Sequence, residues 1–277
     1  MKIAALLAFS AGLMLAGCVS PAPQPAAIPD QVLDMAAGQT VVVLIDSGAV
    51  SVTGSAGDQL ELTGELDSPA ATAFAVEQTE DMIQISAGRP GRPPATSAGP
   101  AARLTLRLPY GTPLKIETFD AAVNLLDYRG SVEVSSAAGH VRAQNLSGTV
   151  RLRSGRGDVT VIGSAGDIRV LGEYGVLTLD EVQGQIGAST IMGTIRLTGE
   201  PRAEDAIHLE TDHGPVEVQL SPGASVQVAV STTSGVITCL LPGLHPEARG
   251  CSGVLGTGAA ELVIRTVSGA VTLGWSQ

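Results

Sequence analysis

A glycine recurs every nine residues through the middle of this chain. Eight such glycines follow one another without interruption, at positions 130, 139, 148, 157, 166, 175, 184 and 193. A fixed short period is the signature of a repeat protein, in which each unit contacts mainly its neighbours. The middle of the chain is therefore expected to be a stack of similar units.

Each nine-residue unit alternates apolar and polar positions. The second and fourth residues after each glycine are apolar and the residue between them is mostly polar, as in Val132, Glu133 and Val134. A period of two is specific to β-strands. Each unit thus predicts one short strand and one turn, where glycine supplies a positive φ or allows a close backbone approach.

The length of a unit limits how the stack can close. Nine residues at about 3.3 Å each cannot wrap around a packed interior, so either two units (18 residues) or three (27 residues) form one rung, and two is favoured. With two, the outward residues separate into two columns. These are Glu133, Arg151, Arg169 and Gly187 on one face, and Arg142, Thr160, Thr178 and Arg196 on the other.

The first column suggests one candidate binding site. Arg151 and Arg169 would lie one strand spacing apart, roughly 4.8 Å, and such a pair could hold an anionic glycan or a lipid head group. The alternative is that both arginines simply cover a neutral surface and pair with local carboxylates.

Irregular alternating segments flank the repeats over residues 40–117 and after residue 214. A solenoid needs atypical caps because its end strands have unpaired edges. The predicted fold is therefore an all-β, single-chain β-solenoid over residues 40–277, with capping strands at both ends. The Pro- and Gly-rich segment 86–102 is expected to be a mobile surface loop.

The first residues predict export and lipidation. Lys2, a short apolar run and the sequence Leu15-Ala16-Gly17-Cys18 resemble a bacterial lipoprotein signal peptide over residues 1–17. Cys18 would carry the lipid, and the Pro-rich stretch 18–39 would be an extended tether. Val19, in place of Asp, favours the outer membrane if the cell is Gram-negative, on the periplasmic or the surface face.

Composition and charge exclude several functions. The net charge is −11, and the chain has only three Phe, three Tyr and one Trp. Nucleic-acid binding requires a concentrated basic surface, often with stacking aromatics, so it is not expected. We find no nucleophile–base motif and no paired-carboxylate motif, and we predict no enzyme activity, catalytic residue or cofactor.

The remaining cysteines and histidines suggest structure more than chemistry. Cys239 and Cys251 form an even pair in an oxidising compartment, so a disulfide is expected, the alternative being two free thiols. His208, Glu210 and Asp212 share one strand face. Their spacing is too wide for convergence on one ion, and no metal site is predicted.

Several segments together resemble a bacterial adhesin-like domain family of unknown function. They are Gly48-Ala-Val-Ser-Val-Thr-Gly54, Leu106-Arg-Leu-Pro-Tyr-Gly111, Ser234-Gly-Val-Ile-Thr-Cys-Leu-Leu-Pro242 and Val267-Ser-Gly-Ala-Val-Thr-Leu273. The resemblance covers residues 40 to 275 and implies a repetitive β-solenoid, but it brings no catalytic residues.

The sequence therefore predicts a membrane-anchored envelope lipoprotein whose non-catalytic solenoid serves adhesion, partner binding or scaffolding. Its partners would be the membrane, through the lipid, and a protein or an anionic glycan. Two alternatives are a periplasmic regulatory or sensory lipoprotein that binds another envelope protein, and a polysaccharide-active β-helix enzyme.

Overall fold

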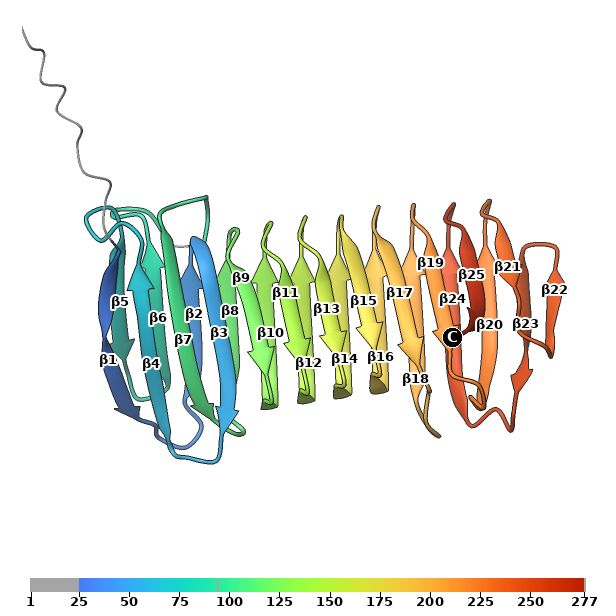
Figure 1. The fold of residues 1–277 in the computed structure, drawn as a ribbon, viewed down its shortest axis with the longest axis horizontal. Coiled ribbons are helices and arrows are strands. Elements are labelled where there is room, and N and C mark those ends of the chain that lie inside the picture. The colour runs from blue at the N-terminus through green and yellow to red at the C-terminus, as the bar shows by residue number, and fades with distance from the viewer. Residues whose placement is uncertain (1–24, 94, 277) are drawn as a thin grey trace, which may run out of the picture.

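A computed structural model describes residues 25–93 and 95–276, and every regular element in these ranges is a β-strand. The strands form two sheets that face each other along the molecule (Figure 1). In spatial order, sheet A contains β1 (Ala26–Asp34), β4 (Gln59–Leu66), β7 (Ala101–Pro109), β3 (Ser47–Ser55), β9 (Ala122–Leu126), β11 (Val141–Gln144), β13 (Val159–Ile162), β15 (Val176–Asp180), β17 (Thr194–Gly199), β19 (Val216–Leu220), β25 (Val271–Trp275) and β21 (Ile237–Cys239). Sheet B contains β22 (Leu244–Glu247), β23 (Gly250–Leu255), β20 (Val226–Thr232), β24 (Ala260–Thr266), β18 (Ala206–Thr211), β16 (Gln183–Thr190), β14 (Ala165–Gly172), β12 (Ser147–Ser154), β10 (Arg129–Ser136), β8 (Leu114–Thr118), β2 (Thr40–Ile45), β6 (Met82–Gly88) and β5 (Ala73–Gln78).

The central rungs repeat every 18 residues, as predicted. Each rung has one strand in sheet B and the next strand of the chain in sheet A, and neighbouring rungs pair in parallel. Val132 pairs with Val150, and Val150 with Ile168. The predicted apolar columns are buried between the sheets and belong to one continuous core. The β-solenoid prediction is therefore confirmed.

The repeated glycines allow adjacent rungs to stack closely at both turns. Gly157 follows β12, and a Cβ there would lie 2.1 Å from the carbonyl oxygen of Gly139 in the neighbouring rung. Gly148, the second residue of β12 after the opposite turn, has a φ of +118°, and its Cβ would lie 2.4 Å from the carbonyl oxygen of Gly130. Any side chain at either position would push the stacked main chains apart.

Both ends of the stack depart from sequence order. The rung formed by β2 and β3 lies between the rung of β6 and β7 and the rung of β8 and β9. At the other end, the rung of β24 and β25 lies between that of β18 and β19 and that of β20 and β21. The final described strand, β25, is therefore inside the stack, and the outermost strands at that end are β21 and β22 (Figure 1).

The predicted tether over 18–39 is wrong for residues 26–34, which form β1. This strand pairs antiparallel with β4, and its Ile28 is buried in the core. The pairing register shifts between Ile28 and Gln31, around Pro29. Proline is tolerated there because an edge strand with a bulge does not need every N–H in the ladder. Residues 1–24, including the predicted signal peptide and Cys18, lie outside the described residues.

The segment 86–102, predicted to be one mobile loop, is strand at both ends and is attached to the body between them. The buried carboxylate of Asp46 accepts hydrogen bonds from the backbone N–H groups of Arg89 at 2.8 Å and Ala95 at 2.7 Å. Nothing in the local composition indicates this attachment, because Asp46 is more than 40 residues away in sequence.

Among the described residues, no helix is long and apolar enough to cross a membrane.

Gly157 and Gly187 provide a matched test of turn stacking. Gly157→Ala should lower the free energy of unfolding by about 1–3 kcal/mol, because the new methyl group overpacks the turn. Gly187→Ala should leave it unchanged or raise it by up to about 1 kcal/mol, since its Cβ would meet nothing closer than the Arg169 side chain at 3.9 Å. Urea unfolding followed by circular dichroism measures both. If both variants lost the same free energy of unfolding, close stacking at the turn would not be the reason for glycine at position 157.

Tyr128 makes stability sensitive to high pH. It is the largest fully buried side chain, and its hydroxyl donates a hydrogen bond to the carbonyl oxygen of Thr112. Burial raises the pKa of Tyr128 to about 12 from an ordinary value of 10.0. The unfolded chain therefore loses this proton at lower pH than the folded chain, and its contribution to stability is lost as the pH rises from 10 to 12.

We therefore expect the urea midpoint to fall over that pH window. Tyr128→Phe should remove this part of the fall, together with the latest step in the tyrosinate absorbance titration. An unchanged late step in the variant would assign the titration to another group.

Candidate functional site

Strands β12 and β14 place a cluster of arginines on the outer face of sheet B. Arg151 and Arg153 alternate with the buried Val150 and Leu152, so both guanidinium groups face solvent. Arg151 pairs in register with Arg169 of β14, which brings the two predicted site residues together on neighbouring strands. The same strand period that placed Arg151 outward also indicated Arg153, two residues on, which the sequence analysis missed.

Of the arginines on this face, Arg169 has an ion-pair partner, whereas Arg151, Arg153 and Arg156 have none among the described residues. Arg169 Nε lies 3.3 Å from Asp167 Oδ1. Over residues 25–93 and 95–276, no carboxylate lies within 4.0 Å of the guanidinium groups of Arg151, Arg153 or Arg156. The alternative interpretation, in which local carboxylates pair with both Arg151 and Arg169, therefore holds for Arg169 and not for Arg151.

On β8, two rungs from β12, a basic side chain has a carboxylate partner. Lys115 Nζ contacts Glu117 Oε1 at 2.7 Å. That hydrogen bond and the charge of Glu117 raise the pKa of the Lys115 ammonium, with a smaller contribution from Glu133. Lys115 is therefore neutralised by an adjacent acid, whereas the arginines of β12 are not.

Two adjoining hollows lie over these side chains. One has a volume of about 340 Å³ and is lined on its surface by Glu133, Ser135, Arg151, Arg153, Arg169 and Leu171. The other, about 410 Å³, extends to the turn after β12 and includes Glu117, Phe119, Ser135, Arg153, Arg156 and Glu173. Since Ser135 and Arg153 line both, we treat them as one depression, the arginine groove. Its volumes fall in the range of small-ligand sites.

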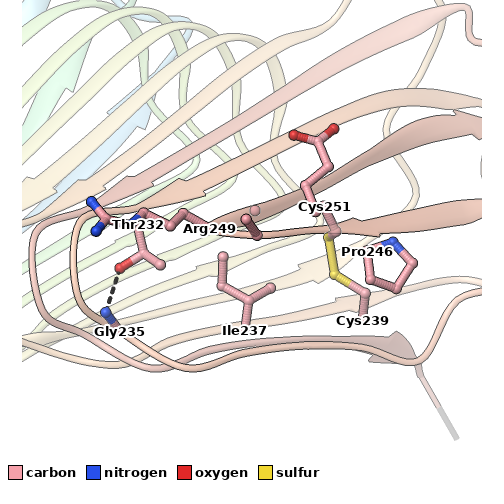
Figure 2. Close-up of a pocket in the computed structure, with 10 residues that line it drawn as sticks. Thr232, Gly235, Ile237, Cys239, Pro246, Arg249 and Cys251 are labelled. Carbon is pink, nitrogen blue, oxygen red and sulfur yellow. Dashed lines mark hydrogen bonds between the residues drawn. A yellow bond between two sulfur atoms is a disulfide. The ribbon is translucent and has the colours of Figure 1, made fainter.

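A second hollow lies at the C-terminal cap (Figure 2). It is lined by Ile237, Pro246, Arg249 and the two cysteines, and the nearby N–H of Gly235 donates a 2.7 Å hydrogen bond to Thr232. Cys239 of β21 and Cys251 of β23 form a disulfide with their Cα atoms 6.8 Å apart. The bridge links sheet A to sheet B at the end of the stack.

Buried hydroxyl groups at the ends of the sheet B strands are structural. The backbone N–H groups of Ala121, Gly193, Gly235 and Gly269 donate to Thr118, Thr190, Thr232 and Thr266, respectively, at 2.7–3.0 Å. Ser136 and Ser154 instead donate to the carbonyl oxygens of Gly139 and Gly157. The sequence signal is a Ser or Thr three residues before the turn residue, usually glycine, and it went unnoticed in the sequence analysis. Thr211 occupies the same place, but its buried Oγ1 has no hydrogen-bond partner.

The histidines of the described residues occupy exposed positions on turns and strands. His213 Nδ1 lies 2.7 Å from Ser268 Oγ, but this exposed pair joins two stacked turns. His208 and Glu210 project from β18, and no group of three or more His, Cys, Asp or Glu residues is placed to hold a metal ion within 25–93 and 95–276.

These features define a two-sheet β-solenoid protein with a basic groove on one outer face. The model of the Toastrack family, DUF4097, matches residues 39–274, and the chain belongs to this family. No curated protein matches the chain.

Among solved structures, a candidate adhesin from Bacteroides fragilis is similar, with 10% identity, a TM-score of 0.40, and coverage of 90% of this chain and 97% of that one. A candidate cell adhesion protein from Clostridium sporogenes has 12% identity, a TM-score of 0.31, and coverage of 91% and 100%. Family membership is assigned on the family model, which spans nearly the whole solenoid.

Removing the disulfide should loosen the cap. The bridge closes a loop with a sequence separation of 12, which corresponds to about 3 kcal/mol of stability by loop entropy. Cys239→Ala with Cys251→Ala should therefore lower the urea midpoint and speed limited proteolysis between residues 240 and 250. As a control, both measurements are repeated on wild type and the double variant in a thiol reductant. Because the reductant breaks the bridge in wild type, the two proteins should then have the same urea midpoint and the same rate of proteolysis. Thiol titration of denatured, unreduced wild-type protein that finds both cysteines free would contradict the bridge.

Proposed function

We propose that this protein is an envelope lipoprotein that displays its β-solenoid as a non-catalytic adhesion surface. The observation that carries the proposal is the regular, solvent-facing column of side chains on each sheet, held in register by the 18-residue rung. Such a surface presents solvent-facing side chains at a fixed spacing over several rungs. It suits contact with an extended or repetitive partner better than enclosure of a small substrate.

The proposed anchor is a lipid on Cys18. The sequence Leu15-Ala16-Gly17-Cys18 supports it, because acylation at such a cysteine would place at least two chains in the membrane. Residues 19–25 would then separate the membrane from β1, which is shorter than the spacer that the sequence alone suggests. Val19 supports the outer membrane as the destination in a Gram-negative cell.

The family and the described residues also support a role without catalysis. The buried serine hydroxyls at the strand ends are used in hydrogen bonds at the turns, to the carbonyl oxygens of Gly139 and Gly157. A binding surface is the simplest use of such an arrangement.

Protease treatment of intact cells tests the proposal. We expect wild-type protein to fractionate with membranes and to lose its solenoid to external protease. Cys18→Ala should abolish membrane retention, because a single substitution removes the only proposed anchor. A matched Cys239→Ala and Cys251→Ala variant should stay in the membrane fraction.

Two results would contradict it. Membrane retention of Cys18→Ala would overturn the lipid anchor. Complete protection of the wild-type domain until the outer barrier is opened would overturn surface adhesion and favour a periplasmic partner.

A further inference from the structure

We infer that the arginine groove binds an anionic polysaccharide through its carboxylate or sulfate groups. This deepens the proposed adhesion function by assigning a ligand class and a site on sheet B. The inference rests on three independent features of the groove: its unpaired charges, their spacing and its flanking groups.

The first feature is a group of arginines that mostly lack ion-pair partners. The chain carries 27 acidic and 16 basic residues, yet four arginines converge on this groove, and only Arg169 has a carboxylate partner among the described residues. A guanidinium group presents a planar fork of donors that matches a carboxylate or sulfate. In a protein with abundant acids, clustered arginines left without partners are available to an external anion.

The second feature is spacing. Arg151 and Arg153 are two residues apart on one strand, so their Cα atoms are about 6.6 Å apart. Arg151 and Arg169 pair in register on adjacent strands, whose backbones are about 4.8 Å apart. Arg156 lies further along, at the turn. A single small anion cannot contact all four, whereas a polymer with charges on successive units can lie along the groove and engage several.

The third feature is the set of flanking groups. Glu133, Glu117 and Glu173 border the groove and can accept hydrogen bonds from sugar hydroxyls, while Leu171 offers an apolar contact to a sugar ring. Phe119 is the one aromatic residue lining the groove, so it cannot provide the successive stacking contacts that single-stranded nucleic acids use. These points favour a polysaccharide over a nucleic acid.

Direct binding of defined polymers tests the inference. The full chain, purified in mild detergent, is exposed to immobilised polygalacturonate, dextran sulfate and uncharged dextran by biolayer interferometry. We expect binding to at least one of the charged polymers but not to dextran, and weakening as salt is raised, because exposed charge contacts are screened.

Variants locate the site. Arg151→Ala with Arg153→Ala should weaken binding by about tenfold or more, since each lost charge-assisted hydrogen bond contributes substantially to affinity. The control, Arg142→Ala with Arg202→Ala, removes the same charge from exposed positions outside the groove and should change affinity by less than about twofold. Arg151→Lys with Arg153→Lys keeps the charge but loses the planar fork, and should give an intermediate affinity. Circular dichroism and urea midpoints verify that all variants are folded.

Three outcomes would overturn the inference. They are no binding to either charged polymer, equal losses in the groove and control variants, and stronger arginine-dependent binding to vesicles of anionic phospholipid or to single-stranded DNA. In each case, normal Cys18-dependent anchoring and protease exposure would leave the proposed surface-lipoprotein role standing, so failure of the site and failure of the function are distinguishable.

Discussion

Close main-chain stacking at the turns is the constraint on which the rest of the structure depends. A carbonyl oxygen of one rung occupies the space that a Cβ would need in the next, at both Gly157 and Gly148. Glycine is therefore required once per strand, which explains the nine-residue period. Because two turns close one rung, every side chain meets its equivalent 18 residues away. The outward columns, including Arg151 and Arg169, follow directly from this turn geometry.

The sequence predicts the central rungs well because their local signals and their tertiary contacts have the same period. It predicts the ends poorly because they depend on contacts between distant segments. The pairing of β1 with β4 and the attachment of Arg89 and Ala95 to Asp46 leave no periodic trace. The arginine groove can be predicted from the sequence only in part. Strand alternation placed Arg151, Arg153 and Arg169 on one face, but the hollow that extends to Arg156 needs the fold of the turn.

The interleaved ends strengthen the attachment of the end strands of this open stack. At the C-terminal end, the chain first forms the outer rung of β20 and β21 and the antiparallel strands β22 and β23. It then returns to place β24 and β25 between that rung and the central ladder. The rung of β24 and β25 is consequently paired on both sides, and the Cys239–Cys251 bridge also holds the cap. Separating the cap would require breaking strands in both sheets, whereas a simple terminal rung could fray alone.

The residues that stabilise the fold are different from those on the outer faces of the sheets. Stability comes from the buried apolar columns and the stacked turns, and neither depends on which polar residue points outward from a central strand. The identical register position in sheet B carries Glu133, Arg151, Arg169 and Gly187 in successive rungs, which shows how little the fold restricts it. A structural role does not explain why arginines gather on β12 in so acidic a chain. Each is exposed, and the two on this strand have no carboxylate partner among the described residues. In the binding mode that we propose, a polymeric anion lying across the rungs would provide the missing partners, and the fixed rung spacing would hold the guanidinium groups in a regular array.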